Sequence, residues 1–533
     1  MDMPANAKMQ TISGKKYVFI DAPYWNAEKH RGEHKRRYIG KIVEGQFVPN
    51  GKYLLSLEKS GTIKPGPVPV TECKWQFYGA TYLLDQIGDK LGIVDDLKAS
   101  FPDRYKQLLS LAYFFVLEEG MSAYRLRKWA LTHKHPYGRD IPSQRISDLM
   151  GSIDEASKMN FFRRQAKRRA EKEYLAFDTT SISSYSELIK LAKYGKNKEG
   201  DHLPQVNLAL LYGEVSRLPV YFRKLTGNTA DVSLIRNLML DIDFLDMKKL
   251  SFVMGRGFYS EKNINDLMKR HHKFLIGIRC GLKIARKHLD EIRGEKMISW
   301  ENYHDDVGLY AMSFTDEWDY REEQPRTGKC ICDKRRVYVH IYFNDQRCTD
   351  ERLSFARYLT CLQDELKSGR KTDGHMKDYD KYFIVTETPK RGLHIVPKGD
   401  AIRERQRDFG YFVLLTNGIK NPVEAIKLYR VRDLIEKAFA NLKERLDMRR
   451  MSVSFSENFE GKLFVQFLAL IYLSYIKKQM DEKGLYKKYT MQTLLDDLDI
   501  IELYQQPGRA HHLSEITKKQ IALYDAMGVP FPK

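Results

Sequence analysis

The chain has 533 residues, of which 42% are hydrophobic and 12% are aromatic, and its formal net charge at pH 7 is +20. This length suits two to four domains with substantial cores, and the composition excludes a disordered chain. So strong an excess of positive charge favours a polyanionic partner, most often nucleic acid.

Neither secretion nor membrane insertion is expected. The first residues, "MDMPANAKMQTISGKK", contain no apolar segment of the kind found in secretory signals. The longest apolar run, residues 463–476, is shorter than the roughly 18 residues that span a bilayer, so it predicts a buried helix. Six cysteines are few for this length, which favours reduced thiols and a cytoplasmic location.

Residues 1–80 form the first predicted region. The segments "KYVFIDAPYW" and "RRYIGKIVEGQFVPN" predict a β-hairpin with Arg36, Arg37 and Lys41 near its loop. Residues 81–172 have a helical pattern and are predicted to bind DNA. Their last helix contains "FFRRQAKRRAEKE", whose six basic residues fit either a DNA-backbone contact or a solvated helix face.

The next region, residues 173–280, alternates between strand and helix patterns. "YLAFDTTSIS" predicts a strand with Asp178 at its exit, and residues 205–225 predict two strands around Gly213 and Glu214. A helix after "GNTAD", the strand "KLSFVMGRG", a second helix and the strand "KFLIGIR" follow. This order predicts an α/β fold with a ribonuclease-H-like mixed sheet.

Residues 281–405 are polar and irregular and predict a β-rich insertion into this core. Its clearest strand is "RRVYVHIYFN", in which Val337, Val339, Ile341 and Phe343 share one face. Residues 406–455 return to the core, beginning with the strand in "RDFGYFVLLTN", and residues 456–533 predict a helical C-terminal region.

A single helix is predicted to present a row of polar side chains in "YRVRDLIEKAFANLKERLDMRR", residues 429–450. Tyr429, Arg432, Glu436 and Lys443 fall within roughly 60° of one another on a helix of 100° per residue. Leu434, Ile435, Phe439, Leu442 and Leu446 lie on the adjoining face. Asn421 and Pro422 mark the start as N-cap and first helical residue. The spacing alone also fits an amphipathic helix with chance charges.

These four residues match the pattern Y-(2)-R-(3)-E-(6)-K, which resembles the signature of a large group of DDE transposases from bacterial insertion sequences, those with a β-strand insertion domain. Other segments agree in order. "YLAFDTTSIS" resembles the first-aspartate strand of the family and "GNTAD" the turn after its third strand. "GRGFYS" resembles its second-aspartate motif, and "KRRYIGKI" the N-terminal hairpin of one branch.

The resemblance implies cut-and-paste transposition on double-stranded DNA, at transposon ends and target, by a homodimer. Two Mg²⁺ (or Mn²⁺) ions held by three carboxylates would serve the chemistry. By position, Asp178 would be the first metal-binding acid and Glu436 the third. Arg432, Lys443, Tyr429 and Arg256 would contact DNA. A buried ion pair between Asp178 and Arg432 is the structural alternative.

The residue expected to be the second aspartate is Gly255. Losing this carboxylate should weaken a metal site and slow the chemistry by orders of magnitude unless another acid replaces it. Asp231, Asp243, Asp246 and Glu261 are the nearby candidates. Three interpretations stay open: an impaired transposase, an active enzyme with a substitute carboxylate, or a DNA-binding protein that no longer cuts.

Overall fold

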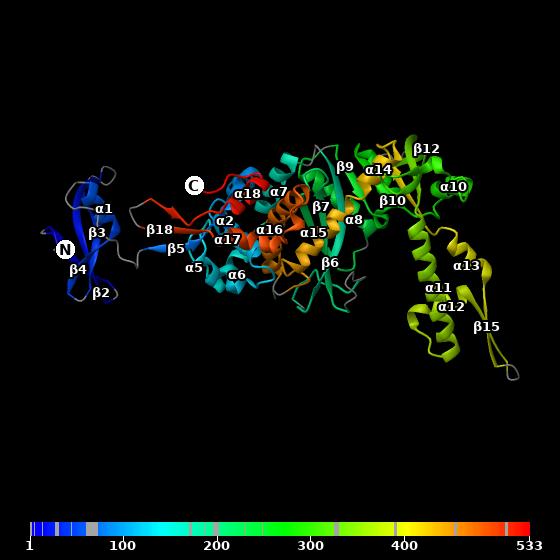
Figure 1. Ribbon diagram of the computed structural model, residues 1–533, viewed down its shortest axis with the longest axis horizontal. Coiled ribbons are helices and arrows are strands. Elements are labelled where there is room, and N and C mark those ends of the chain that lie inside the picture. The colour runs from blue at the N-terminus through cyan, green and yellow to red at the C-terminus, as the bar shows by residue number, and fades with distance from the viewer. Residues whose placement is uncertain are drawn as a thin grey trace.

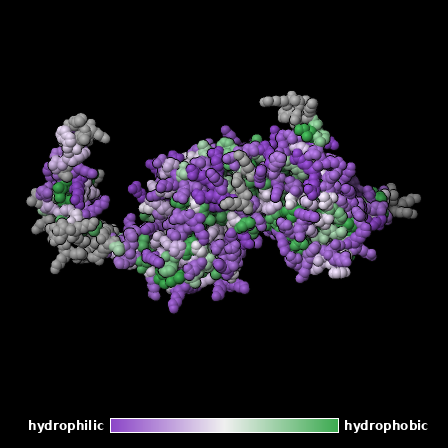
Figure 2. All heavy atoms as spheres, turned by 90° about the horizontal axis from the view of Figure 1, so that it is seen from above, coloured by the Kyte–Doolittle hydropathy of each residue, from purple (hydrophilic) through white to green (hydrophobic). Residues whose placement is uncertain are grey.

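The structure of the chain is a computed structural model, and it is mixed α/β, as the sequence predicts (Figure 1). It describes residues 3–4, 6–12, 14–26, 31–43, 45–59, 73–169, 173–186, 188–195, 202–229, 231–247, 249–323, 330–388, 392–451, 456–506 and 510–533. Seen from above, hydrophilic side chains cover most of the described surface (Figure 2).

The N-terminal region is a small antiparallel sheet that lies at one end of the molecule (Figure 1). Its elements are β1 (Ala7–Ile12), β2 (Lys15–Asn26), β3 (Arg31–Val43), β4 (Gln46–Pro49) and α1 (Gly51–Lys59). Val18, Ile39 and Phe47 form its own core. The pairing of β2 with β3 extends out to Asn26 and Arg31, so Lys41, opposite Tyr17, lies at the end of the ladder away from the loop. Its expected place near the loop is wrong, because the strands are longer than predicted.

A helical body follows, built from both halves of the chain. Its N-terminal helices are α2 (Gly79–Lys90), α3 (Ile93–Ser100), α4 (Tyr105–Leu117), α5 (Leu126–Thr132), α6 (Ser143–Gly151) and α7 (Glu155–Arg169). Its C-terminal helices are α16 (Ser456–Glu482), α17 (Met491–Asp499) and α18 (Lys518–Ala526). A small sheet joins the two halves, in the order β19 (His512–Leu513), β18 (Glu502–Gln505), β5 (Lys74–Phe77).

Helix α16 is the centre of this body. It contacts α4, α6 and α15 and also strand β8 of the large sheet, and its residues from Leu463 to Ile476 are all buried. Among the described residues it is the one helix long and apolar enough to cross a membrane by length and composition, yet 94% of its apolar window lies inside the protein. The predicted buried helix is therefore present, and it is longer than its apolar run.

The large sheet has ten strands in the order β11-β12-β13-β16-β10-β9-β6-β7-β8, with β17 pairing at β6. These strands are β6 (Tyr174–Ser184), β7 (Gln205–Gly213), β8 (Pro219–Thr226), β9 (Ser251–Met254), β10 (Lys273–Ile278), β11 (Tyr303–His304), β12 (Leu309–Glu323), β13 (Cys330–Phe343), β16 (Tyr411–Thr416) and β17 (Arg450–Met451). Strand β9 pairs in parallel with β6, and β10 pairs in parallel with β9. On the other side of β6, β7 pairs antiparallel with β6, and β8 pairs antiparallel with β7. The associated helices are α8 (Asp231–Phe244), α9 (Glu261–Lys269), α10 (Lys283–Ile292), α14 (Pro422–Tyr429) and α15 (Arg432–Glu444).

The predicted insertion is mixed in secondary structure rather than β-rich. Its strands β12 and β13 join the large sheet through β16, so that both faces of β13 are buried near its end, including His340 and Tyr342. The rest projects as an arm in Figure 1. The arm consists of α11 (Asp345–Ser368), α12 (Met376–Tyr382), β14 (Phe383–Thr388), β15 (Gly392–Pro397) and α13 (Gly399–Gln406).

The contact between α16 and α6 depends on Gly461, which gives a first test. A Cβ atom at Gly461 would overlap the Met150 carbonyl oxygen, so the two helices would have to separate. We expect Gly461→Ala to destabilise the protein by about 1–3 kcal/mol, the usual cost of overpacking, although helix propensity alone favours alanine. Gly281→Ala is the control, because a Cβ there meets open space. Equal melting temperatures for the two variants would contradict this packing.

Candidate functional site

The parallel pairing of β6 with β9 brings Asp178 and Gly255 together. Phe177 lies opposite Met254 at the end of the paired stretch, so the next residues on the two strands are Asp178 and Gly255. The sequence predicts Asp178 at the exit of its strand. This is wrong, because β6 continues to Ser184 against β7. It lies instead at the point where β9 stops and leaves one edge of β6 open.

After Gly255 the chain turns through a short 3₁₀ helix, Arg256–Phe258, into helix α9. The Ser260 hydroxyl caps α9 by accepting from the Asn263 N–H at 3.1 Å. Gly255 itself has φ −72° and ψ 166°, an extended conformation open to any residue. The backbone therefore does not require glycine here, and what matters is the missing side chain.

The helix predicted to present the polar row is two helices, α14 and α15, which meet at Arg430 and Val431. The predicted start is confirmed, since the Asn421 side chain accepts from the N–H groups of Val423 and Glu424. Tyr429 therefore ends α14 and does not share the axis of the other three residues. Its hydroxyl nevertheless accepts from Arg432 Nη1 at 3.1 Å. Gly277 of β10 provides the room, because a Cβ there would lie 2.7 Å from that hydroxyl.

Helix α15 packs on β6 through its apolar face. Of the predicted stripe, Ile435, Phe439, Leu442 and Leu446 are buried, and Leu434 is half-buried. Ala438, which was not predicted, is buried beside them. Arg432, Glu436 and Lys443 line one pocket beside this face. The pocket also takes in Asp178, Gly255 and Arg256, so the predicted site residues other than Tyr429 all line it.

This pocket, called here the Asp178 pocket, has a cavity volume of about 630 Å³. Its cationic side chains are Arg256, Arg432, Lys443 and Arg449. Its carboxylates are Asp178, Glu436 and Glu444. Sequence reasoning missed Glu444 and Arg449, which form an ion pair with 3.7 Å between Glu444 Oε1 and Arg449 Nη2. Their only signal was position, since Glu444 ends the helix that carries Glu436 and Arg449 follows it.

An ion pair between Asp178 and Arg432 is the central interaction of the pocket. Arg432 Nη2 lies 2.7 Å from Asp178 Oδ2 and 4.0 Å from Glu436 Oε1. The second oxygen of Asp178 accepts from the Thr179 N–H at 2.8 Å. Asp178 is 8% exposed, so the pair is largely shielded from water. Burial lowers the pKa of Arg432, but Tyr429 and Asp178 outweigh this and leave the pKa raised, so the guanidinium stays charged.

The residues of the pocket do not fit a site for two divalent ions. Position 255 supplies no side-chain oxygen, the Arg432 guanidinium lies against Asp178 Oδ2, and the side chain of Glu436 is 65% exposed. Within the described part of the chain, no three histidine, cysteine or acidic residues gather closely enough to hold a metal ion. The donor set lacks one of the three carboxylates that such a site needs.

The nearby acids do not lie in this pocket either. Asp243, at the end of α8, pairs with Arg270. Asp246 lies in the turn after α8, and Glu261 opens α9; neither lines the described pocket. The side chain of Asp231 lies outside the described residues. Glu444 does line the pocket, but it pairs with Arg449, and among the described residues it does not gather with two other acids closely enough to hold a metal ion. No described carboxylate therefore takes the place of the missing one.

Three residues of the basic run on α7 contact other parts of the protein, although only Arg169 is buried and Lys172 lies outside the described residues. Arg168 makes two hydrogen bonds of 2.8 Å to Asp96, and Arg169 donates to the Leu91 carbonyl oxygen. Arg163 donates to the Phe244 carbonyl oxygen and lies over the Phe244 ring. Arg164 and Lys167 are exposed. Much of the run therefore fixes α7 against its neighbours.

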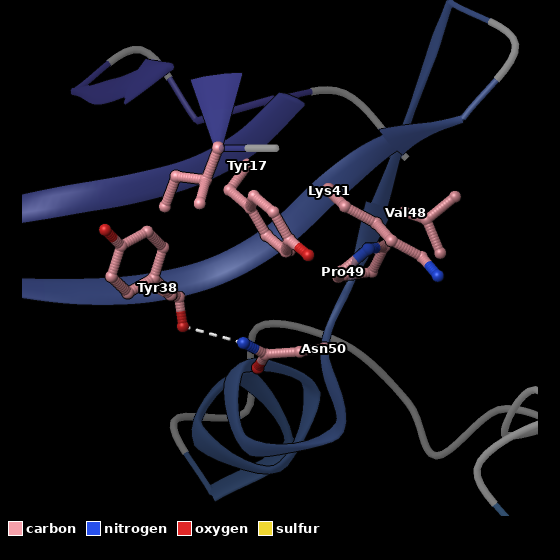
Figure 3. A pocket seen from close by; sticks show the side chains of 8 residues that line it. Tyr17, Tyr38, Lys41, Val48, Pro49 and Asn50 are labelled. Carbon is pink, nitrogen blue, oxygen red and sulfur yellow. Dashed lines mark hydrogen bonds between the residues drawn. The ribbon is translucent and has the colours of Figure 1, made fainter. Parts of the chain in front are cut away.

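A second hollow lies on the N-terminal sheet (Figure 3), with a cavity volume of about 530 Å³. Tyr17, Tyr38 and Lys41 line it, together with Val48 and Pro49 of β4. The Asn50 amide closes one side by donating to the Tyr38 carbonyl oxygen at 2.7 Å. Because two aromatic rings and a lysine gather here, this face has the chemistry of a nucleic-acid contact.

The Asp178–Arg432 pair can be measured by a double-mutant cycle. We expect Asp178→Asn and Arg432→Met each to lower the free energy of unfolding, because each leaves a shielded charge or dipole without its partner. The two changes should couple by about 0.5–3 kcal/mol in urea unfolding. The control cycle combines Arg432→Met with Asp525→Asn on α18, which should be additive. Additivity in the first cycle as well would contradict the pair.

Comparison with known proteins gives the family. No curated protein sequence matches the chain. One similar solved structure is the piggyBac transposase synaptic complex with hairpin DNA, at 11% sequence identity, covering 78% of this chain and 70% of that chain with a TM-score of 0.34. At that level of likeness the assignment rests on sequence. Residues 169–472 match the family described as Transposase DDE domain. This match spans more than half of the protein, from the end of α7 into α16, and the chain therefore belongs to the DDE transposase family.

Proposed function

We propose that the chain is a transposase of a bacterial insertion sequence that binds the terminal inverted repeats of its element, and that Gly255 impairs its cutting and joining of DNA. The observation that carries this proposal is the Asp178 pocket. There the first and third expected acids meet around Arg432, and the position of the second acid is a glycine.

The order of the strands supports a ribonuclease-H-like core. Strands β6, β7 and β8 form an antiparallel set, and β9 and β10 add in parallel on the other side of β6. With helices α8 and α9 between the later strands, this is the arrangement proposed from the sequence. In that core Asp178 lies on the central strand, where a reacting phosphate would approach the open edge left by β9.

The polar row supports the assignment to the group with the Y-(2)-R-(3)-E-(6)-K signature. Arg432 and Lys443 line the pocket, and Tyr429 holds Arg432. A guanidinium fork and an ammonium are suited to phosphate oxygens, so these groups and Arg256 would position the DNA backbone. An intact member of the group would bind two Mg²⁺ or Mn²⁺ ions for cut-and-paste transposition. This chain would act as a homodimer on DNA, in the cytoplasm at the nucleoid.

A second candidate is a DNA-binding protein derived from a transposase that no longer cuts. The same pocket favours it, since its lining keeps four cations, and its extra carboxylate, Glu444, pairs with Arg449 instead of joining Asp178 and Glu436 in a metal-binding group. The two candidates predict the same DNA contacts and differ only in whether chemistry can be restored.

An excision assay in cells separates these candidates. A marker flanked by the ends of the element would be supplied with the native chain, with Gly255→Asp, or with either one carrying Asp178→Ala. We expect excision only from Gly255→Asp with Asp178 intact, at a gain of orders of magnitude over the native chain. Excision by the native chain that Asp178→Ala abolishes would mean that another carboxylate has taken over.

The N-terminal sheet should contribute to DNA affinity. Arg37 and Lys41 are exposed along β3, so reversing both to glutamate should weaken binding to double-stranded DNA. The slope of log affinity against log salt should also fall, by about 1 for each phosphate that the protein no longer neutralises. Lys52→Glu on α1 is the control, because Lys52 is exposed in the same region but does not line the hollow. An equal reduction from Lys52→Glu would mean that only overall charge matters.

A further inference from the structure

We infer that the Arg432 guanidinium takes the place of a metal ion in the Asp178 pocket, and that the pocket binds a DNA backbone phosphate without any divalent cation. This inference rests on the proposed function, since it takes DNA as the ligand. It goes beyond that function by stating what replaces the missing ligand and what the replacement does.

The first step is steric. A Cβ atom at Gly255 would lie 3.0 Å from Arg432 Nη2 and 3.1 Å from Cζ, closer than ordinary contact. The guanidinium thus lies against the space where the second carboxylate would begin. A side chain at position 255 would require the guanidinium to shift by a few tenths of an ångström, which the end of a long arginine side chain can do at small cost.

The second step concerns Asp178, the acid that would bridge two metal ions. One of its oxygens already accepts from the Thr179 N–H and the other from Arg432. Oδ2 keeps a second lone pair. A divalent ion bound there would lie beside the Arg432 guanidinium and be repelled by its charge, so it would have to push the guanidinium away. Because the pair is largely shielded from water, separating it costs more than separating an exposed pair.

The third step is the anchoring of Arg432 itself. Its second terminal nitrogen donates to the Tyr429 hydroxyl, and the guanidinium carbon lies 5.4 Å from the centre of the Tyr429 ring. Tyr429 is in turn held against β10, where Gly277 admits its hydroxyl. Arg432 is therefore fixed from two sides, by Asp178 and by Tyr429, as a resident cation would be by its ligands.

The fourth step is the charge of the pocket. Its four cationic side chains outnumber its three carboxylates, so the lining is net positive before any ion binds. An aspartate at position 255 would make the lining neutral, and a phosphate would then depend on added metal ions for attraction. With glycine, Arg432 neutralises Asp178, Arg449 pairs with Glu444, and Arg256 and Lys443 add positive charge to the lining that would attract a phosphate.

The test uses the full chain and a labelled duplex carrying the terminal repeat of the element, followed by fluorescence anisotropy. Binding is measured in EDTA and in MgCl₂ at matched ionic strength. We expect the native chain to bind equally well in both buffers. Gly255→Asp should bind on the order of tenfold more weakly in EDTA and recover in MgCl₂. Gly374→Asp is the control for added charge, because it lies in the arm with open space around it, and it should bind like the native chain.

A direct measurement of metal binding completes the test. Titration with Mn²⁺, followed by electron paramagnetic resonance, should show no stoichiometric site in the native chain. A site should appear in the double variant Gly255→Asp with Arg432→Gln, which restores the acid and removes the arginine. Arg432→Lys, which keeps the charge, should retain more metal-independent DNA binding than Arg432→Gln.

The outcomes separate the inference from the proposed function. DNA binding by the native chain that requires MgCl₂, or a stoichiometric Mn²⁺ site in it, would overturn the inference and leave the proposed function intact. Failure of the native chain to bind the duplex in either buffer would overturn both. Measurements on the native chain decide the inference even if a variant fails to fold.

Discussion

The parallel pairing of β9 with β6 is the constraint on which the site depends. It is only four residues long, and it sets position 255 beside position 178 because Phe177 pairs with Met254. A shift of one residue would turn Asp178 or the Gly255 position to the opposite face of the sheet. The register is in turn fixed by burial, since Phe252, Val253 and Met254 are fully enclosed and tolerate no such exchange.

On this frame, the role that we infer for Arg432 is to replace an exchangeable ion with a covalently attached one. A bound metal ion comes and goes with its concentration, whereas Arg432 is always present and carries its own supports, Tyr429 and Asp178. A metal ion also offers open coordination positions to water and substrate, which a guanidinium does not. The substitution therefore preserves the electrostatics needed to hold a phosphate while removing the means of activating a nucleophile.

The strands and helices around the site could be predicted from sequence because their signals are local. Buried runs marked β6, β9 and β10, and the Asn421–Pro422 cap marked the start of α14. Helix α11 was missed because its buried residues, Cys348, Phe355, Leu362 and Leu366, make too thin a stripe among polar neighbours. A stripe of that width gives little periodic signal, although it suffices to pack one side of a helix.

What fills the space at Gly255 could not be predicted, because it depends on contacts distant in sequence. The sequence shows that a carboxylate is missing and that an arginine lies on the expected helix face. The direction of the Arg432 side chain is decided by the break between α14 and α15 and by Gly277, which lets Tyr429 approach from β10. Likewise, the joining of β12 and β13 to the core sheet through β16 follows from pairing, which no local pattern specifies.

The central place of α16 has a consequence for how the protein is made. Helices α2 to α7 leave the ribosome early, but the helix that fills the space between them is encoded after the whole sheet and arm. Residues of α18 and the segment after it then bind α2, the first helix of the body. Tyr524 donates a hydrogen bond to the Gly79 carbonyl oxygen, and Lys90 donates one to the Gly528 carbonyl oxygen. A nascent chain therefore exposes the apolar faces of these helices through most of its synthesis. Its folding ends in one late closure that joins α2 to α18.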